Sequence, residues 1–261
     1  MRQWTSYGDK AMMIDIHTHV LPGVDDGAAD LDEALTLLAM AADSGVDTVV
    51  TTPHGNIPDE YKNYVCPELD ALWRALGREV QRAGIPVRLC RGMEIFATED
   101  MPDLLEQGKV WTLNGTAYFL TEFAFGEEPD FCFDVLRRCR EKDFRPVIAH
   151  PERYLFVQDE PAIAYEWCTM GYGLQLNKGS LLGKFGRPAQ LTAELLMDHG
   201  LAACVASDAH SAVQRTTHMG EIRRYLAERW GEDYARLLLE ENPSRILKGR
   251  ELLGYEPIPV L

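Results

Sequence analysis

The sequence has few cysteines, and none of them stand in a paired spacing. There is no Cys-x-x-Cys pair among its six cysteines, which are Cys66, Cys90, Cys132, Cys139, Cys168 and Cys204. Scattered thiols of this kind predict neither a thiolate zinc site nor a disulfide framework. They suit a cytoplasmic protein whose cysteines stay reduced.

Positive charge is also scarce. Lysine and arginine together number 26 against 41 aspartates and glutamates, a net charge of −15. Such a balance disfavours general binding to nucleic acid or to an anionic membrane surface. An anionic substrate would need a local cationic site to overcome that field, and bound metal ions could provide one.

Long apolar stretches are missing as well. No stretch approaches the length of a membrane span, and residues 1–10 lack the apolar centre of a signal peptide. With 46% hydrophobic residues, the composition is that of an ordinary globular protein without membrane insertion. We expect an N-terminal extension over residues 1–12 and a single domain over residues 13–261.

Glycine is absent where a cysteine-dependent phosphatase would need it. Cys132 to Arg138 and Cys139 to Arg145 both have the Cys-x5-Arg spacing of such enzymes. A phosphate-cradling loop requires turn residues, whereas the residues between these pairs form a helical apolar stripe. Both matches are rejected.

What the chain does have is a regular alternation of strands and helices. Helices are predicted from Asp30 to Gly45, from Pro67 to Gly84 and at 131–142, 161–170, 189–199 and 219–253, the last interrupted at Asn242-Pro243. The strands between them are predicted at 12–19, 48–52, 87–95, 118–123, 146–149, 174–177 and 202–207. This α/β alternation implies a parallel sheet, either closed or doubly wound.

Metal-ligating residue types gather at the ends of these strands. Asp15, His17 and His19 share one face of the opening strand, because side chains alternate along a strand. Five of the seven histidines fall at strand ends, and six of the seven strands end in His, Asp or Glu. In a closed barrel those ends converge on one mouth, so we predict a distorted seven-stranded (β/α) barrel. The candidate metal ligands are His17, His19, Asp26, His54, Glu94, Glu122, His150, Asp208 and His210.

Nine nitrogen and oxygen ligands exceed what one ion can use, so two to three divalent ions are expected. Imidazole and carboxylate ligands without thiolate suit manganese, iron or zinc. Manganese is the first expectation, with iron, zinc and magnesium as alternatives. We expect Asp15 to orient a histidine in the second shell rather than to bind an ion itself.

Five motifs follow one another along the chain, namely Asp15-x-His17-x-His19, Thr52-Pro53-His54, Gly92-Met93-Glu94-Ile95, Ala149-His150-Pro151-Glu152-Arg153-Tyr154 and Ser207-Asp208-Ala209-His210. Their order resembles that of the PHP superfamily, the polymerase and histidinol phosphatase group of metal-dependent phosphoesterases. Further motifs are similar to its bacterial protein-tyrosine phosphatase branch, the CpsB/YwqE type. These lie at 24–27, 120–123, 179–186 and 242–247. The resemblance runs from about Met13 to the C-terminus.

The resemblance implies a three-metal cluster in a distorted seven-stranded barrel. His17, His19, Glu94 and Asp208 would hold the first ion, and Glu94 would bridge to a second ion held by His54 and His150. Asp26, Glu122 and His210 would hold the third. Arg153 matches the phosphate-site arginine of the family, and Arg215 lies where a second one is expected. Lys178, which follows the sixth strand, is a weaker phosphate-binding candidate. Together with Asp208, the two arginines are the catalytic candidates.

The implied activity is hydrolysis of phosphotyrosine in proteins, a phosphoric monoester hydrolase reaction. By resemblance, the partner would be a bacterial tyrosine kinase of capsule or exopolysaccharide synthesis. Paired cations can bind phosphoryl oxygens and lower the pKa of a water to about 7, so that hydroxide attacks phosphorus. A tyrosyl leaving group, with a pKa of about 10, needs little help from a general acid, and no acid is assigned.

Three other functions stay open at this point. The first is a phosphatase for histidinol phosphate or another small molecule, from the same superfamily. The second is a metal-dependent amidohydrolase, which would need no arginines at the mouth. The third is a non-catalytic metal-binding regulator. The sequence also leaves homo-oligomer formation open.

Overall fold

The computed structural model describes residues 12–254 and 257–260. The expected extension over residues 1–12 therefore lies, except for Met12, outside the described residues, and the single domain over residues 13–261 stays a prediction. Within the described ranges, no helix combines the length and the apolar character that crossing a membrane requires.

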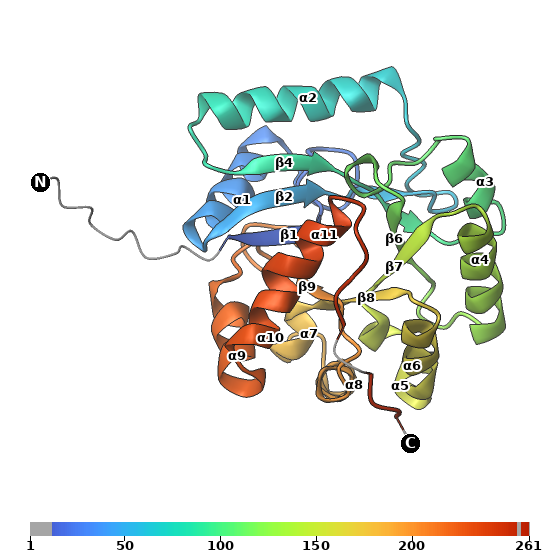
Figure 1. The fold of residues 1–261 in the computed structure, drawn as a ribbon. Helices are drawn as coiled ribbons and strands as arrows, with labels where there is room; N and C mark the ends of the chain where they lie inside the picture. Colours follow the sequence, from blue (N-terminus) through green and yellow to red (C-terminus); the bar gives the residue numbers. More distant parts are fainter. Residues whose placement is uncertain (1–11, 255–256, 261) are drawn as a thin grey trace, which may run out of the picture.

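The strands form two parallel sheets (Figure 1). The first has the order β1-β2-β4 and the second the order β3-β5-β6-β7-β8-β9. Every pairing between neighbouring strands is parallel. The predicted parallel α/β architecture is thus confirmed. The strands are β1 (Met13–Thr18), β2 (Val46–Thr51), β3 (His54–Gly55), β4 (Arg88–Arg91), β5 (Glu94–Phe96), β6 (Tyr118–Glu122), β7 (Arg145–Ala149), β8 (Gly173–Asn177) and β9 (Cys204–Ala206).

One predicted strand is divided in two, and another is followed by a short strand that was not predicted. The strand predicted over 48–52 is β2, and the short strand β3 follows it after Pro53, which has no N–H to donate to a neighbouring strand. Its carbonyl instead accepts a 3.1 Å hydrogen bond from the N–H of Glu94. The third strand, predicted over 87–95, breaks into β4 and β5 at Gly92-Met93.

The first and last strands meet through very few hydrogen bonds. The N–H of His19 donates to the carbonyl of Ala209 at 2.8 Å, and a single bridge pairs Thr18 with Ala209. A further hydrogen bond runs from the N–H of Asp208 to the carbonyl of His17 at 2.9 Å. The described residues therefore form two sheets rather than one closed sheet. The closed seven-stranded barrel stays a prediction.

Helices flank the strands on several sides, with α2 furthest out and α9 and α10 on the opposite side (Figure 1). Asp30 caps α1 as expected, because its side chain accepts from the N–H of Glu33 at 2.9 Å. The helices are α1 (Leu31–Asp43), α2 (Pro67–Arg82), α3 (Met101–Glu106), α4 (Pro129–Glu141), α5 (Leu155–Asp159), α6 (Ala162–Thr169), α7 (Lys178–Leu181), α8 (Arg187–Asp198), α9 (Gly220–Trp230), α10 (Glu232–Arg236) and α11 (Asn242–Ile246).

The C-terminal helical region differs from its prediction. The chain turns at Gly231, where φ is 93°, and not at Asn242-Pro243. Pro243 lies in the first turn of α11, where a helix has no use for the missing N–H. The helix then ends at Ile246 rather than near Leu253.

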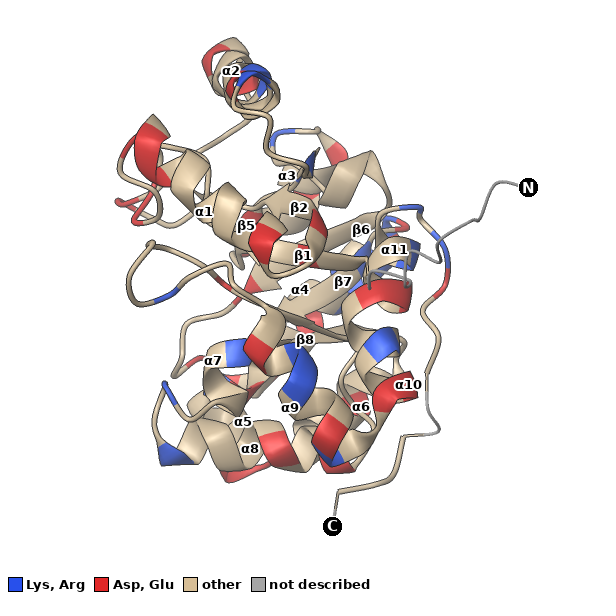
Figure 2. Ribbon diagram, turned by 90° about the vertical axis from the view of Figure 1, so that its left-hand side faces the viewer, with Lys and Arg blue, Asp and Glu red and all other residues tan. Residues whose placement is uncertain are grey.

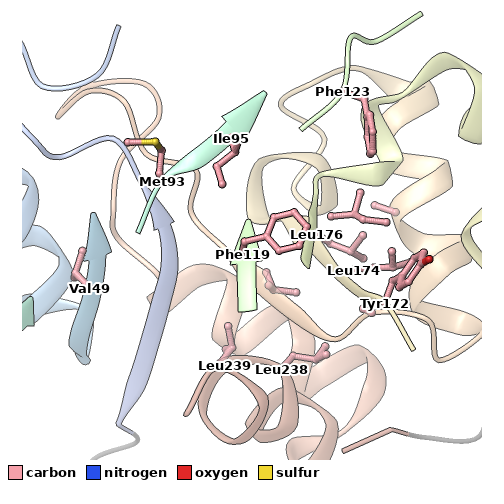
Figure 3. Packing of buried hydrophobic residues seen from close by; sticks show 14 of the residues in the cluster. Val49, Met93, Ile95, Phe119, Phe123, Tyr172, Leu174, Leu176, Leu238 and Leu239 are labelled. Atoms are coloured by element: carbon pink, nitrogen blue, oxygen red, sulfur yellow. The ribbon is translucent and has the colours of Figure 1, made fainter. Parts of the chain in front are cut away.

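Two clusters of buried apolar residues hold these layers together. The larger one lies between strands and helices, and Figure 3 shows part of it, including Phe119, Leu174 and Leu176. The smaller one joins side chains of six strands, among them Ile16 and Leu120, with Ile246 of α11. Burying a side chain of this size contributes about 1.5–3 kcal/mol.

Hydrogen bonds fix α11 at the amino-terminal ends of the strands. The Asn242 amide donates to the carbonyl of Ala203 before β9, and the Thr116 hydroxyl before β6 donates to the carbonyl of Ile246. One end of the strand assembly is thereby covered, and the carboxyl ends remain for the site.

Candidate metal centre

The nine candidate ligands meet at the carboxyl ends of the strands. Seven of them are buried, while His54 is partly buried and Asp26 is exposed. They form three overlapping groups, and within each group the potential ligand atoms all lie within 4.8 Å of one another. The groups are His17, His19, Glu94 and Asp208; His54, Glu94 and Glu122; and His19, Asp26, His54 and His210.

The first group surrounds one carboxylate oxygen. Glu94 Oε2 lies 3.1 Å from Nε2 of His17 and 3.1 Å from Nε2 of His19. Asp208 Oδ1 lies 3.5 Å from each of the same nitrogens. The residues are those expected around the first ion.

Glu122 belongs to a different group from the one expected. Its Oε1 lies 2.9 Å from His54 Nδ1, so it joins His54 and Glu94 rather than Asp26 and His210. The third group takes His19 and His54 instead. His150 borders the second group, with Nε2 at 3.0 Å from Glu94 Oε1.

Two buried ligand atoms of these groups lack hydrogen-bond partners. Glu94 Oε2 and His54 Nδ1 are buried 3.1 Å apart, yet neither has a hydrogen-bond partner. The Nε2 atoms of His17 and His19 point at each other across 3.2 Å. Buried polar atoms are normally paired, so this arrangement fits a cage of donors for cations.

Electrostatics in the cluster favour ionised carboxylates. Burial alone would raise the pKa of the Glu94 carboxyl, but His17 and His54 lower it well below its usual range. Burial would likewise lower the pKa of His19, yet Asp25 and the neighbouring carboxylates raise it well above its usual value. Protonated imidazoles thus compensate the negative charge of the carboxylates. A bound cation would displace these protons.

Asp15 does not orient a histidine ring, contrary to our prediction. Its Oδ1 accepts from the N–H of Ser207 at 3.0 Å. The pairing of β1 with β2 shifts register between Asp15 and Thr18, so the simple alternation from Asp15 to His17 does not hold. Its carboxyl is fully buried, and burial raises its pKa.

Asp25 and Gln175 orient the histidines instead. Asp25 Oδ2 lies 2.8 Å from Nδ1 of His19 and accepts from the N–H of His54 at 2.9 Å. Gln175 Oε1 lies 2.7 Å from Nδ1 of His17. With a proton on each Nδ1, the Nε2 lone pairs of His17 and His19 face the first group.

β8 contributes no candidate ligand but carries a chain of buried amides. The Gln175 amide donates to Asn177 Oδ1 at 3.2 Å, and the Asn177 amide donates to Asp208 Oδ2 at 2.6 Å. Glu152 Oε1 accepts from the N–H of Asn177 at 3.0 Å. The strand therefore links His17 to Asp208 through neutral groups.

Local backbone geometry brings the ligands into place. His150 and Asp208 follow β7 and β9 with φ of 36° and 49°, in the left-handed region that non-glycine residues seldom adopt. In the loop before α1, a Cβ on Gly27 would lie 2.1 Å from the carbonyl oxygen of His19. Only glycine lets the loop that carries Asp25 and Asp26 approach this closely.

Two arginines converge on Asp208 from the mouth. Arg215 Nη2 lies 2.5 Å and Arg153 Nη1 3.5 Å from Asp208 Oδ2. The Arg153 guanidinium lies over the rings of Phe125 at 4.7 Å and Phe185 at 4.5 Å. Both guanidiniums are partly exposed, so they are free to offer donors to an anion in the mouth.

Lys178 is placed differently. Its ammonium donates to the backbone carbonyls of Thr216 and His218 and is almost fully buried. Within the described residues, no hydrogen bond or ion pair joins it to Asp208 or to the arginines. Its expected part in phosphate binding stays a prediction.

The cysteines rejected earlier are buried in α4. Cys132 and Cys139 are fully inaccessible, and burial raises the pKa of Cys139 to about 12. Neither thiol could act as a thiolate nucleophile at neutral pH.

Several residues around the site were not predicted. Gln175 and Asn177 stand two apart on a strand, which places them on one face, and this signal was available in the sequence. Asp25 adjoins Asp26, but nothing in the sequence distinguished their roles. Phe125 and Phe185 lie in loops, where no periodicity indicates a partner.

Comparisons with known proteins place the chain in a family. The sequence profile of the family described as "Capsular polysaccharide synthesis, CpsB/CapC" matches residues 13–248. Tyrosine-protein phosphatase YwqE of Bacillus subtilis is 32% identical over 248 residues, which are 95% of this chain and 96% of that relative.

Solved structures are similar as well. One is described as crystal structures of YwqE from Bacillus subtilis and CpsB from Streptococcus pneumoniae, "unique metal-dependent tyrosine phosphatases". It matches with a TM-score of 0.89 at 32% identity and covers 95% of this chain and 100% of that chain. A lactonase from Listeria monocytogenes shares the fold alone, with a TM-score of 0.60 at 11% identity over 92% of this chain and 95% of that one.

Proposed function

The chain belongs to the CpsB/CapC family of capsular polysaccharide synthesis proteins, and from this premise we propose that it is a metal-dependent protein-tyrosine phosphatase. One observation carries the proposal. Two arginines face a carboxylate that also belongs to a buried group of potential metal ligands. A phosphate ester placed there would meet cations on both sides.

The proposed metal centre holds two to three divalent ions. His17, His19, Glu94 and Asp208 hold one, and His54, Glu94 and Glu122, bordered by His150, hold a second. His19, Asp26, His54 and His210 are the donors for a third. Imidazole and carboxylate donors suit manganese first, with iron, zinc or magnesium as alternatives. When bound, the ions would lower the pKa of water and neutralise phosphoryl oxygens.

The protein's own residues bind and orient the ester. Arg153 and Arg215 donate to phosphoryl oxygens in fork-shaped pairs, and both already point at the site. Phe125 and Phe185 help to hold the Arg153 guanidinium in place, because both rings contact it through cation–π interactions. Hydrolysis transfers the phosphoryl group to water and releases the tyrosine hydroxyl, for which no general acid is assigned.

The proposed substrate is a tyrosine-phosphorylated bacterial kinase of capsule or exopolysaccharide synthesis. The description of the family supports this partner. Around the mouth, Tyr61 is stacked on His54 with ring centroids 5.8 Å apart, and Phe125 is 44% exposed. Exposed aromatic faces of this kind suit the phenyl ring of phosphotyrosine.

A closed barrel and a cytoplasmic location belong to the same proposal. The contact of His19 and Thr18 with Ala209 supports closure of the strands around one mouth. Six free cysteines suit a reducing compartment. The net charge of −15 supports the expectation that nucleic acid is not a partner.

Substitution of single histidines tests the proposal. We expect His54→Ala and His150→Ala each to abolish turnover of para-nitrophenyl phosphate, while circular dichroism shows a folded protein. His199→Ala, at the end of α8, removes an imidazole outside the site and should keep wild-type turnover. Wild-type rates in both site variants would contradict the proposal.

Substrate choice separates the phosphatase classes. We expect the protein to hydrolyse phosphotyrosine peptides and to leave histidinol phosphate almost untouched. Rapid hydrolysis of histidinol phosphate without action on the peptides would instead favour a small-molecule phosphatase. Inorganic phosphate should inhibit hydrolysis of the peptides by competing for the site. An amidohydrolase would not be inhibited in this way.

A further inference from the structure

A second cationic pocket lies beside the mouth. It has a volume of about 440 Å³ and contains none of the candidate metal ligands. Lys178, Lys184 and Arg215 line it, together with the apolar side chains of Leu182, Phe185 and Val213. No aspartate or glutamate of the described ranges lines it, although the chain carries a net charge of −15.

The pocket shares a wall with the phosphate site. Arg215 lines it and also contacts Asp208 Oδ2 at 2.5 Å. Phe185, the other shared residue, lies with its ring 5.5 Å from the Arg215 guanidinium and 4.5 Å from that of Arg153. A group in the pocket would therefore be a near neighbour of an ester bound at the two arginines.

The walls of the pocket are held in place before any ligand arrives. The Lys178 ammonium donates to the carbonyls of Thr216 and His218, which fastens the loop carrying Arg215. Glu33 Oε1 accepts from the N–H of Ala212 at 3.2 Å and fixes the start of the same loop. Phe185 packs directly on Gly179, where a Cβ would lie 2.6 Å from its ring.

The cations of the pocket are only partly neutralised, because Arg215 pairs with Asp208 whereas Lys184 does not. Lys184 is exposed and forms no ion pair with another described residue, unlike Arg137 and Lys142, which have carboxylate partners. Burial lowers the pKa of Lys178 to about 8, which leaves it mainly protonated at neutral pH. Unpaired positive charge in a concave, partly apolar site attracts anions.

We propose that this pocket binds an anionic group that flanks the phosphotyrosine of the substrate, either a carboxylate or a second phosphoryl group. The inference rests on the proposed function and adds a substrate class to it, acidic or multiply phosphorylated segments. Leu182, Phe185 and Val213 would contact the stem of the flanking side chain, while the cations contact its charged end.

Matched phosphotyrosine peptides test the pocket. They differ only at one flanking position, which carries glutamate, glutamine, lysine or a second phosphotyrosine, and separate sets vary the N-terminal and the C-terminal side. We expect a threefold to tenfold higher kcat/KM for glutamate than for glutamine on one side, about the size that one or two partly exposed ion pairs give. The preference should arise mainly in KM and shrink at high salt.

Charge reversal assigns the effect to the pocket. Lys184→Glu should remove the preference for glutamate, and Lys184→Gln should reduce it. Lys248→Glu changes the net charge equally but lies at the opposite end of the strands, beside Met12 and Asp47, and should keep the preference. The second-phosphotyrosine peptide shows whether a phosphoryl group is bound better than a carboxylate.

Equal kcat/KM for glutamate, glutamine and lysine peptides in the wild-type protein would overturn the inference. So would a preference that survives Lys184→Glu. Para-nitrophenyl phosphate has no flanking residues and reports the proposed function separately. If this ester is turned over while the peptides have equal kcat/KM values, only the proposed role of the pocket is refuted. If no phosphate ester is turned over, the proposed function is refuted.

Discussion

Asp25 is the residue on which two candidate ligands and their loop depend. Its carboxylate contacts the His19 ring, the N–H of His54 and the N–H of Gly27 at 2.8, 2.9 and 3.0 Å. Burial alone would raise the pKa of Asp25, but His19 lowers it, so the carboxylate is ionised and a strong acceptor. Its place beside the ligands is that of a metal-site carboxylate that orients imidazole.

Replacing Asp25 should weaken metal binding without unfolding the protein. In Asp25→Asn, an amide N–H₂ donor replaces one of the two carboxylate oxygens that accept hydrogen bonds. We expect metal affinity to fall by about 10- to 100-fold as a result. Metal content after dialysis against graded chelator concentrations measures this. Asp30→Asn, which preserves the cap of α1, is the control and should retain its metal. Unchanged affinity in Asp25→Asn would contradict the assigned role.

Lys178 should make the free energy of unfolding increase with pH in the alkaline range. Burial lowers its pKa to about 8, so between pH 8 and its ordinary 10.5 the unfolded chain binds more protons than the folded one. The penalty for burying the charge is therefore complete below pH 8 and disappears as pH rises to 10.5. Relative to Lys178→Met, the wild-type free energy of unfolding should rise by about 3 kcal/mol across this window. Urea unfolding at several pH values measures it, and parallel pH profiles for both proteins would contradict it.

At the scale of elements, β8 stabilises the site without binding anything itself. Gln175 and Asn177 point to the site, while Leu174 and Leu176 belong to the large apolar cluster. The amide chain between His17 and Asp208 is fully buried, so each missing partner costs about 1–3 kcal/mol.

Gln175→Leu should distinguish an effect of β8 on metal binding from an effect on the stability of the fold alone. It removes the acceptor of His17 Nδ1 and the donor to Asn177, and we expect lower stability together with about 10- to 100-fold weaker metal binding. Leu174→Ala on the same strand should lower stability by about 2–5 kcal/mol and leave the metal affinity of the folded protein intact. Calorimetric titration with Mn²⁺ compares the two. Equal affinities would assign Gln175 to stability only.

Elements also show where sequence reasoning succeeds and where it ends. The meeting of His54, Glu94 and His150 was predictable, because carboxyl ends of parallel strands converge whatever their exact register. The partner of Asp15 was not, because a register shift in β1 is decided by pairing with β2. The end of a strand before Pro53 was open to prediction from the missing N–H of proline, whereas the left-handed turn at Asp208 is set by tertiary contacts.

At the scale of the whole molecule, charge is distributed unevenly. Figure 2 shows aspartate and glutamate on α1 and α10 and residues of both charge signs on α9. The site itself collects imidazoles and carboxylates. The overall field of −15 repels phosphate esters, so attraction must come from the arginines, the second pocket and the bound ions. Metal ions are thus central to both substrate binding and reaction.

Hydrolysis of a phosphotyrosine peptide after metal removal and restoration is the most direct measurement of that claim. We expect chelator-treated protein to stay folded but to lose hydrolysis almost completely, and added Mn²⁺ to restore it. Parallel additions of iron, zinc and magnesium show how much hydrolysis each ion restores. Undiminished hydrolysis by protein shown to be free of metal would contradict the central role of the metal ions.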